Sequence, residues 1–517
     1  MDLKNKKVLI FQQRGWAITI GHFLAKKLQA EGCKLAAVTL KKSTHNFVLN
    51  QKEVEYKYIL SIDDITNNPD DFLSRNISLE EICDDLGIDT IWPLINSNRQ
   101  LVRSYREKYY YGYGQNVPDE HIVKYFKALC IQLKVIFDNF RPDLVIVAGF
   151  IFEGHAILSL FAQKYNIPII GATDSKIKNY YIFCNDFDCT KGRFFKRVDE
   201  LNNRIKTSDN IIMAREYIKK FREEFIQPQR LLELREQENN KSLLLKIKSE
   251  LSPFKQILSW YLKGKPKYYR VNYLSNIGSL TDTRTPRIIF RDYIMQKKFR
   301  RAANKFNYYD FNKINKYVYF PLQFQPEGTI DATAPFFCNQ IETARQVAMS
   351  LPGDYTLVVK DHPAMFGLRS PSYLKKLYKT PNVKLIDYRI SNEEVLKKAD
   401  LIISPNSTSI AEAAFLRKPA IQLGNLGTTL KLPNVFCHTD MTTLSKRIKE
   451  VLGVELMTEE YERRLENYVA AVYDVGFDFD YRKLWDGREK NSISIFLDIY
   501  FKEFESLYED KLYNPNL

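Results

Sequence analysis

Two short polar segments in the second half of the chain combine residue types that can bind a phosphate group. In the first, VVKDHP at residues 358–363, an apolar run ends at Lys360, and His362 stands directly before Pro363. Because a proline restricts the backbone around it, it keeps the imidazole at the end of the run. A neutral histidine donates one hydrogen bond to a phosphate oxygen, and a protonated one adds positive charge. These residues predict an anion site; a loop histidine that packs on its proline is the alternative.

The second segment, SPNSTS at residues 404–409, lies between an apolar run and a helical pattern. Ser407 and Thr408 stand where the helix begins, and there the unpaired N–H groups and the helix dipole attract anions. A helix cap without a ligand is the alternative. Glu412, one turn into the helix, can meet a ribose hydroxyl, or it is a solvated helix carboxylate. The two segments lie about 45 residues apart and end neighbouring strands of one predicted sheet, so we expect them to hold one phosphate.

Two further polar residues, Gln325 and Glu327, end the run YVYFPLQFQPE at residues 317–327. Their position after a predicted strand places them near the same site as substrate contacts, where Glu327 could position a sugar or the acceptor. An ordinary strand-to-loop transition is the alternative.

The first half of the chain offers candidate catalytic carboxylates at the ends of its own predicted strands. Glu153 and His155 follow the run LVIVAGF, and Asp174 follows IPII. A carboxylate there can take the proton from an acceptor hydroxyl or serve as a nucleophile, so Glu153 and Asp174 compete for this role. Arg14, after the first apolar run, is a candidate contact for an anionic acceptor or a sugar, and His155 is a second substrate contact.

The elements that must position these residues alternate between short apolar runs and amphipathic helical patterns. In the first half the predicted strands are 7–11, 34–40, 141–150 and 166–171, with helices 19–30 and 154–165. In the second half the strands are 316–323, 355–360, 383–386, 400–404 and 419–423, with helices 336–350, 371–379, 391–399 and 408–417. This alternation is typical of parallel sheets, which bind ligands beyond the carboxyl ends of their strands. The predicted fold class is α/β, with two Rossmann-like domains that face each other across a cleft.

The 517 residues divide into four predicted segments: a first Rossmann-like domain 1–205, a helical basic linker or insertion 206–315, a second Rossmann-like domain 316–445 and C-terminal helices 446–517. Residues 241–316 hold eighteen Lys or Arg against four Asp or Glu, and so generate much of the net charge of +15. The basic, tyrosine-rich stretch 260–305 can bind anionic lipid, an acidic polysaccharide or nucleic acid, or it is a solvated surface with its tyrosines packed inward. We favour membrane or glycan contact and expect no nucleic acid partner.

The composition predicts a folded protein of a reducing compartment. The start, MDLKNKKVLIF, contains a short apolar run that we interpret as a strand and not as a signal peptide, and no run approaches the length of a membrane-spanning helix. Seven scattered cysteines without CxxC pairs argue against a disulfide scaffold or a zinc ribbon. We therefore expect a cytoplasmic protein that contacts the inner face of the membrane peripherally.

The series YVYFPLQFQPE, VVKDHP, PNVKLID and SPNSTSIAEAAFLRKPAIQLGN resembles bacterial capsule polysaccharide biosynthesis proteins, which are related to the Kdo transferases of capsule assembly. The resemblance covers residues 316–426 and is only architectural over 1–200. It implies a GT-B glycosyltransferase with a nucleotide-sugar donor, in that family often CMP-Kdo. The family's motifs fall on His362-Pro363, on Ser407-Thr408 and on Gln325-Pro326-Glu327, with Asp361 where the family often has Glu.

Patterns that indicate other chemistry are weak or missing from the sequence. The triplet Asp-Phe-Asp at residues 186–188 matches the DxD metal signature of the other large glycosyltransferase fold. Such a triplet is common by chance, and the chain otherwise differs from that fold. No GxGxxG follows the first apolar run, no P-loop occurs, and the six histidines lack metal-ligand spacing. We expect no metal and no cofactor besides the donor.

The sequence thus predicts transfer of a sugar, Kdo or a related acidic sugar, from a nucleotide donor, with CMP favoured, to a capsule or surface polysaccharide precursor. The donor nucleotide would lie on the second domain, held by six residues: Lys360, His362, Pro363, Ser407, Thr408 and Glu412. A glycan or lipid-linked acceptor would lie on the first domain. A polyol-phosphate transferase of the teichoic-acid type, a sugar-nucleotide epimerase, and a non-catalytic capsule assembly protein docked at the membrane are the alternatives.

Overall fold

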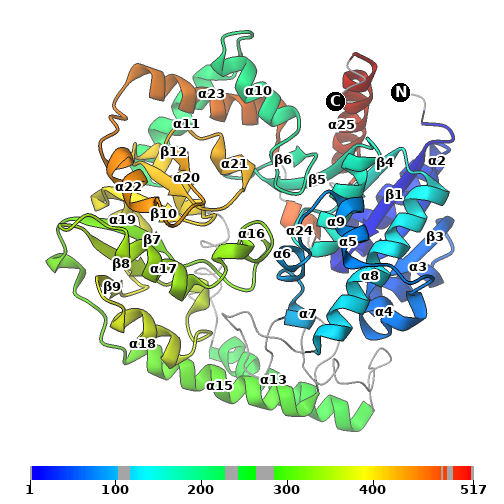
Figure 1. The fold of residues 1–517 in the computed structure, drawn as a ribbon, viewed down its shortest axis with the longest axis horizontal. Helices are drawn as coiled ribbons and strands as arrows, with labels where there is room; N and C mark the ends of the chain where they lie inside the picture. Colours follow the sequence, from blue (N-terminus) through cyan, green and yellow to red (C-terminus); the bar gives the residue numbers. More distant parts are fainter. Residues whose placement is uncertain are drawn as a thin grey trace.

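Two β-sheets form the centres of the two halves of the molecule (Figure 1). The structure is a computed structural model, and it describes residues 3–102, 117–226, 243–263, 285–478, 481–485 and 493–513. Helices cover the faces of both sheets, which confirms the predicted α/β class with two Rossmann-like domains. Among the helices in these ranges, none is both long enough and apolar enough to cross a bilayer.

The first sheet has the strand order β13-β6-β5-β4-β1-β2-β3. Its strands are β1 (Lys7–Gln12), β2 (Lys34–Thr39), β3 (Tyr56–Ser61), β4 (Leu144–Val147), β5 (Ile169–Asp174), β6 (Tyr180–Cys184) and β13 (Phe477–Asp478). Strands β1 to β5 pair in parallel, whereas β6 and β13 are antiparallel to their neighbours. The order reverses between β1 and β4, as in doubly wound folds that bind ligands at this point.

The second sheet has the order β12-β11-β10-β7-β8-β9, and all its strands run in parallel. The strands are β7 (Tyr317–Pro321), β8 (Thr356–Lys360), β9 (Val383–Ile386), β10 (Leu401–Ser404), β11 (Ala420–Gln422) and β12 (Val435–Cys437). The order reverses between β7 and β10, so the loops after β7, β8 and β10 meet at one edge. The motifs singled out in the sequence lie on these three loops.

Most helices of the first half flank the first sheet, but the last of them packs on helices 408–415 and 459–475 of the later chain. The helices of the first half are α1 (Arg14–Trp16), the π-helix η1 (Ala17–Gly21), α2 (His22–Ala30), α3 (Lys42–Asn50), α4 (Ile62–Asn67), η2 (Pro69–Phe72), α5 (Leu79–Leu86), α6 (Trp92–Ile95), α7 (Arg99–Val102), α8 (Asp119–Val135), η3 (Ile136–Phe140), α9 (Glu153–Lys164), α10 (Arg193–Asn202) and α11 (Ile211–Glu224). The helix expected at 19–30 begins earlier, at Arg14, and contains a π segment.

The remaining helices belong to the basic middle segment, the second half and the C-terminal part. They are α13 (Leu243–Lys263), α15 (Pro286–Asn304), η4 (Phe311–Lys313), α16 (Gly328–Asp331), η5 (Pro335–Phe337), α17 (Gln340–Met349), η6 (Pro363–Met365), α18 (Pro371–Lys379), α19 (Asn392–Lys398), α20 (Thr408–Phe415), α21 (Gly427–Leu430), α22 (Leu444–Leu452), α23 (Glu459–Val475), α24 (Tyr481–Trp485) and α25 (Ile493–Tyr513). Ser370, Ser391 and Ser407 cap the starts of α18, α19 and α20 with their hydroxyls.

The C-terminal part of the chain returns to the first half. Helix α23 packs against α10 and α11, and β13 then adds an antiparallel strand to β6. Tyr500 and Phe504 of α25 are buried in the same apolar core as Leu24 and Phe183. The described residues of the predicted segment 446–517 are therefore mostly helical, and they also supply one strand and part of the core of the first domain.

Direct contacts fix the two halves against each other. Asn96 donates a hydrogen bond to the carbonyl of Asp331 at 2.8 Å. The hydroxyl of Tyr468 donates to the carbonyl of Ser175 at 2.9 Å, and lies 3.1 Å from that of Thr428. The N–H of Gly427 donates to the carbonyl of Asp188 at 2.9 Å. A methyl group has no room at this last contact.

We predict that Gly427→Ala destabilises the protein. An added Cβ would lie 2.0 Å from the carbonyl oxygen of Cys189, which is backbone and cannot move aside cheaply. Overpacking of this kind typically costs about 1–3 kcal/mol. Chemical denaturation should show a lower free energy of unfolding, whereas Gly353→Ala, where a Cβ meets nothing within 4 Å, is the matched control. Equal stability of the two variants would contradict the tight contact between the halves.

Candidate functional site

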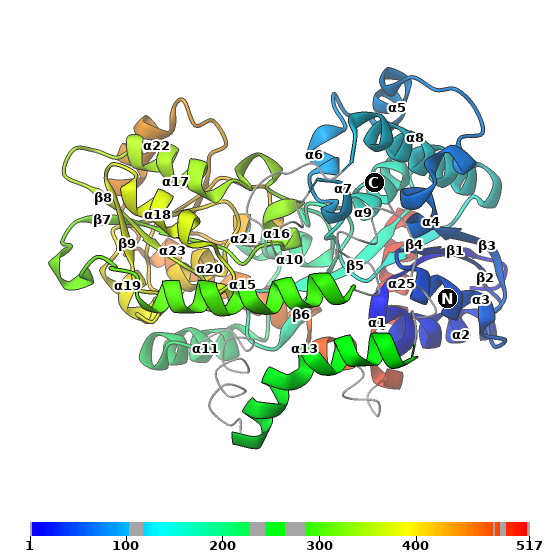
Figure 2. The same cartoon turned by 90° about the horizontal axis from the view of Figure 1, so that it is seen from below.

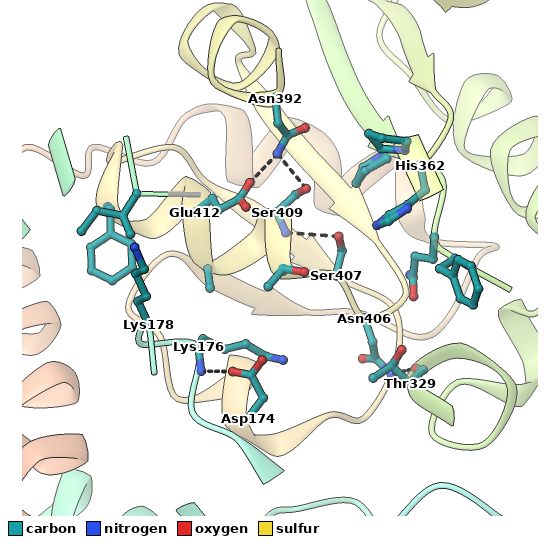
Figure 3. A pocket seen from close by; sticks show the side chains of 18 of the residues that line it. Asp174, Lys176, Lys178, Thr329, His362, Asn392, Asn406, Ser407, Ser409 and Glu412 are labelled. Atoms are coloured by element: carbon teal, nitrogen blue, oxygen red, sulfur yellow. Dashed lines mark hydrogen bonds between the residues drawn. The ribbon is translucent and has the colours of Figure 1, made fainter. Parts of the chain in front are cut away.

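A cavity of about 460 Å³ lies between the two halves, at the carboxyl ends of β7, β8 and β10. One wall comes from the second half, with residues from the segments 319–329, 360–364, 390–392 and 406–415. The opposite wall comes from residues 173–181, which form the end of β5 and its turn into β6. Helix α11, which packs on Phe415 of α20, lines the cavity between these walls. Figure 3 shows His362, Ser407 and Glu412 on the first wall, with Asp174, Lys176 and Lys178 across from them. The site is thus built by both domains.

His362 lines the cavity at the end of β8. Its Nδ1 accepts a hydrogen bond from the N–H of Ala364 at 3.1 Å, where it caps the short helix η6. Because Nδ1 is an acceptor in this bond, the neutral ring carries its proton on Nε2 and presents that atom as a donor. Pro363 lines the cavity beside it.

A buried ion pair holds the loop that carries His362. The Nε of Arg369 lies 2.7 Å from Oδ1 of Asp361, and the same oxygen accepts the N–H of His362 at 2.8 Å. Another nitrogen of Arg369 donates to the carbonyl of Gln323 at 2.6 Å. Burial raises the pKa of Asp361, and the adjacent guanidinium opposes that shift. The loops after β7 and β8 are therefore tied together.

Ser407 and Thr408 line the cavity at the start of α20. The hydroxyl of Ser407 accepts the N–H of Ser409 at 3.2 Å, so it acts as the helix cap. Asn406, just before it, donates to the carbonyl of Thr329 at 2.9 Å and fixes this loop to the one after β7. The positive end of the helix dipole and two hydroxyls thus face the cavity beside His362.

Glu412 lines the cavity and is 7% exposed. Asn392 donates hydrogen bonds both to this carboxyl group and to the hydroxyl of Ser409, as Figure 3 shows. Burial raises the pKa of Glu412 to about 7, and the hydrogen bond from Asn392 and the charge of Lys360 oppose the shift. Lys360 is itself buried, and its ammonium group donates to the carbonyl of Ile390 at 3.0 Å.

The opposite wall carries an acidic and two basic side chains on one turn. Asp174 is exposed, and its Oδ1 accepts the N–H of Lys176 at 2.6 Å. The N–H of Lys178 donates to the hydroxyl of Tyr217 at 3.2 Å, which holds the turn against α11. In the part of the chain that the structure describes, no ion pair joins Lys176 or Lys178 to a carboxylate. Both ammonium groups are therefore available to an anion in the cavity.

Sequence reasoning missed Lys176, Lys178 and Asn392. The two lysines alternate within KIK in a short turn after a strand, which also looks like an ordinary solvated turn. The two lysines follow Asp174 by two and four residues, just after a predicted strand, and this position was the signal that could have identified them.

The QPE element divides between the cavity and the interior. Glu327 lines the cavity, and one of its carboxylate oxygens accepts the hydroxyl of Thr329 at 3.2 Å. Gln325 is 0% exposed and donates to Asp331 at 2.7 Å and to the carbonyl of Cys338 at 3.0 Å. Gln325 thus shapes the loop after β7 from behind, and it is not among the residues that line the cavity.

The structure does not bring Glu153 and His155 into the cavity. Glu153 is 0% exposed and accepts hydrogen bonds from Asn98 at 2.5 Å and from the hydroxyl of Tyr125 at 2.6 Å. Burial raises its pKa to about 8. His155 is equally buried, packs edge-on against Phe11 with ring centroids 4.3 Å apart, and has its pKa lowered to about 3 by burial. Both residues begin α9 inside the first domain.

Two other predicted features belong to the first half. Arg14, the predicted acceptor contact, begins α1 after the first strand, and its side chain lies outside the described part of the structure. In the DxD triplet, Asp186 accepts the N–H groups of Thr190 at 2.7 Å and Lys191 at 2.8 Å, so it shapes a turn. Among the described ranges, no cluster of three or more His, Cys, Asp or Glu side chains has the arrangement of a metal site.

One known protein family matches part of the chain, mainly in the second half. The family model described as capsule polysaccharide biosynthesis protein matches residues 266–426, which confirms the resemblance over the segment that carries His362 and Ser407. No curated protein matches the chain.

Solved structures match at low similarity. UDP-GlcNAc 2-epimerase from Methanocaldococcus jannaschii is 13% identical, with 87% of this chain and 93% of that chain covered and a TM-score of 0.24. KpsC from Thermosulfurimonas dismutans, described as a beta Kdo 2,7 transferase, is 11% identical, with 66% and 78% covered and a TM-score of 0.32. The trehalose-6-phosphate phosphatase N-terminal domain from Candida albicans is 12% identical, with 97% of each chain covered and a TM-score of 0.28. These likenesses carry no argument about the reaction.

The buried carboxyl group of Glu153 generates a prediction about stability and pH. Its folded pKa of about 8 lies above the ordinary value of 4.5, so the folded state binds a proton that the unfolded state has already released. The contribution of Glu153 to the free energy of unfolding is therefore greatest below pH 4.5. It falls by on the order of 1 kcal/mol per pH unit as the pH rises toward 8. Glu153→Gln keeps an oxygen acceptor for Asn98 and Tyr125 but cannot ionise.

Denaturant titrations between pH 5 and 8 should show a smaller loss of stability for Glu153→Gln than for the wild type. Glu216→Gln, at an exposed position of α11, is the control and should follow the wild type. Parallel curves for Glu153→Gln and the wild type would show that Glu153 ionises freely in the fold.

Proposed function

We propose that this chain is a glycosyltransferase whose donor nucleotide binds in the cavity between the two halves. The observation that carries the proposal is that phosphate-binding groups face each other across that cavity. His362 and the start of α20 at Ser407 lie on one wall, and Lys176 and Lys178 lie on the other. The family match over residues 266–426, to capsule polysaccharide biosynthesis proteins, supports a carbohydrate substrate.

In this proposal the donor phosphate lies between His362 and the two hydroxyls at the start of α20. Nε2–H of His362 donates to one phosphate oxygen, and the hydroxyls with the helix dipole bind the others. Glu412 accepts a hydrogen bond from a ribose hydroxyl, as the sequence suggests, and Asn392 orients its carboxyl group. Lys176 and Lys178 reach the phosphate from the other domain and compensate the charge that develops as it leaves.

Of the two carboxylates proposed for catalysis, we favour Asp174. It lines the cavity and is exposed, whereas Glu153 is enclosed by Asn98 and Tyr125. The acceptor hydroxyl oxygen forms a bond to the anomeric carbon, the bond from that carbon to the phosphate oxygen breaks, and Asp174 takes the hydroxyl proton. The electron pair of the broken bond leaves with the nucleotide phosphate.

The donor that we favour is a CMP-sugar, with Kdo or a related acidic sugar, and the acceptor is a capsule or surface glycan precursor, either free or lipid-linked. The support is the sequence resemblance together with the family match. Such chemistry places the protein on the cytoplasmic side of the membrane, where nucleotide sugars are available. A polyol-phosphate transferase would use a cytidine diphosphate donor in the same cavity and is separated from our proposal by product analysis.

Nucleotide titration tests the binding site. With a nucleotide at 100 times its dissociation constant, the folded state gains about 2.7 kcal/mol, so the melting temperature should rise with CMP. CDP, UDP and GDP are compared in parallel. His362→Ala and Lys178→Ala, on opposite walls, should each weaken binding about 10- to 100-fold, because each removes a hydrogen bond or an ion pair to a charged group.

His438→Ala is the matched control, since His438 lies in the same half and bonds to Thr443 at 3.2 Å outside the cavity. If no nucleotide shifts the melting temperature of the wild type, the transferase proposal fails and a non-catalytic assembly protein becomes the better description. If only UDP acts, and a UDP-sugar is neither hydrolysed nor used for transfer, an epimerase is favoured.

The catalytic assignment has its own test. Asp174→Asn keeps the oxygen that accepts the N–H of Lys176, so the turn should remain folded. We expect release of CMP from a CMP-sugar in the presence of acceptor to fall by roughly 10²- to 10⁴-fold, as for loss of a general base. Nucleotide binding, measured by the same thermal shift, should be unchanged. Full turnover by Asp174→Asn would exclude this residue as the base.

A further inference from the structure

Helix α13 exposes a continuous row of apolar side chains. They are Ile247, Leu251, Phe254, Leu258, Tyr261 and Leu262, which are between 42% and 74% exposed. Their spacing of mostly three or four residues places them along one side of the helix. Buried faces of helices normally have this pattern, so its exposure indicates a surface that another apolar phase covers.

The contacts that hold α13 to the molecule leave most of this row uncovered. Within the described ranges, its main neighbour is α15. Glu250 of α13 pairs with Lys297 of α15 at 2.8 Å, and the ring of Phe254 packs edge-on against Tyr293 with centroids 5.1 Å apart. Figures 1 and 2 show both helices running along one border of the molecule, outside the two sheets.

Helix α15 carries further exposed apolar side chains and anchors the pair of helices. Phe299 and Ala303 of α15 are buried, whereas Phe290 and Ile294 are 50% and 46% exposed. Phe290 and Ile294 lie four residues apart, so they share one side of the helix. We call the exposed apolar side chains of α13 and α15 the apolar face.

Cations border the apolar face, and the acidic side chains of the two helices are neutralised. The exposed basic residues are Lys248 and Lys255 on α13 and Arg287, Lys298, Arg300 and Arg301 on α15. Each helix contains one acidic residue, and these are Glu250, paired with Lys297, and Asp292, paired with Arg291 at 2.8 Å. The face therefore combines apolar surface with a net positive charge.

We propose that the apolar face docks on an anionic phospholipid membrane, with α13 lying in the plane of the interface. Apolar side chains of such a helix enter the boundary between headgroups and acyl chains, and bordering Lys and Arg contact anionic headgroups. A polynucleotide would use the cations but would leave the leucine and isoleucine side chains in water. A second copy of this face would bring like charges together. Anionic lipid matches both the apolar surface and the positive charge of the face. This inference does not depend on the reaction in the cavity.

Vesicle flotation tests the proposal with the full chain. Wild type should float with vesicles of phosphatidylcholine and 30% phosphatidylglycerol at low salt, and should float far less with phosphatidylcholine alone or in 0.5 M NaCl. The double variant Leu251→Glu/Leu258→Glu should lose at least about tenfold in membrane partitioning, because two charges enter the apolar row. Met457→Glu, at a residue 79% exposed outside the face, is the matched control.

Circular dichroism, the melting temperature and the nucleotide-dependent thermal shift of each variant establish that the fold and the cavity are intact. Binding by wild type and by Met457→Glu, but not by the double variant, supports the proposal. Absence of wild-type flotation, equal binding by the double variant, or equal binding to neutral vesicles overturns it, and these wild-type results stand even if the double variant misfolds. A dimer in solution that the double variant dissociates, without any vesicle binding, would assign the face to self-association instead.

Discussion

The ion pair between Asp361 and Arg369 is the interaction on which the geometry of the cavity depends. Both side chains are buried, at 6% and 2% exposed, and removal of one partner of such a pair typically costs about 3–5 kcal/mol. Arg369 also binds the carbonyl of Gln323, and the side chain of Gln323 donates to Ser404 at 3.1 Å. Three strand ends, those of β7, β8 and β10, are thereby connected through buried polar groups. The position of His362 relative to Ser407 follows from these bonds.

The opposite wall depends on a different kind of support. The turn that carries Lys176 and Lys178 is held by the hydroxyl of Tyr468, which reaches it from α23. Helix α23 follows the second domain in the chain but packs mainly on α10 and α11. The same helix therefore contacts both walls, because Tyr468 also approaches the carbonyl of Thr428. Relative movement of the two walls would have to break or rotate this contact.

Sequence reasoning placed residues best where their position follows directly from local order. His362 and Ser407 come directly after buried strands, and the sheet edge of a doubly wound fold brings such residues together. The helix at 371–379 and the strand at 383–386 have the predicted bounds, because a proline or serine signal stands at their ends. Local pattern and tertiary structure agree in these segments.

Sequence reasoning was less accurate where the position of a residue or strand depends on contacts between distant segments. Glu153 also follows a strand, but Asn98 and Tyr125 enclose it, and nothing in its own neighbourhood encodes their approach. The strand β13 has only two residues and forms because β6 offers it an edge. In both cases the deciding partner lies more than twenty residues away in the sequence, beyond the reach of periodicity or turn signals.

The return of the C-terminal segment has a consequence for how the chain is made. Leu24 and Phe183 share one apolar core with Phe496, Tyr500 and Phe504 of α25. During vectorial synthesis, the part of this core that α25 covers therefore stays exposed while the whole second domain is translated, although α2 already packs on the same side. That interval is long on the timescale of folding, and an uncovered sheet face is prone to aggregation. The nascent chain would accordingly need a chaperone, or a temporary cover from its own early segments, until α25 leaves the ribosome.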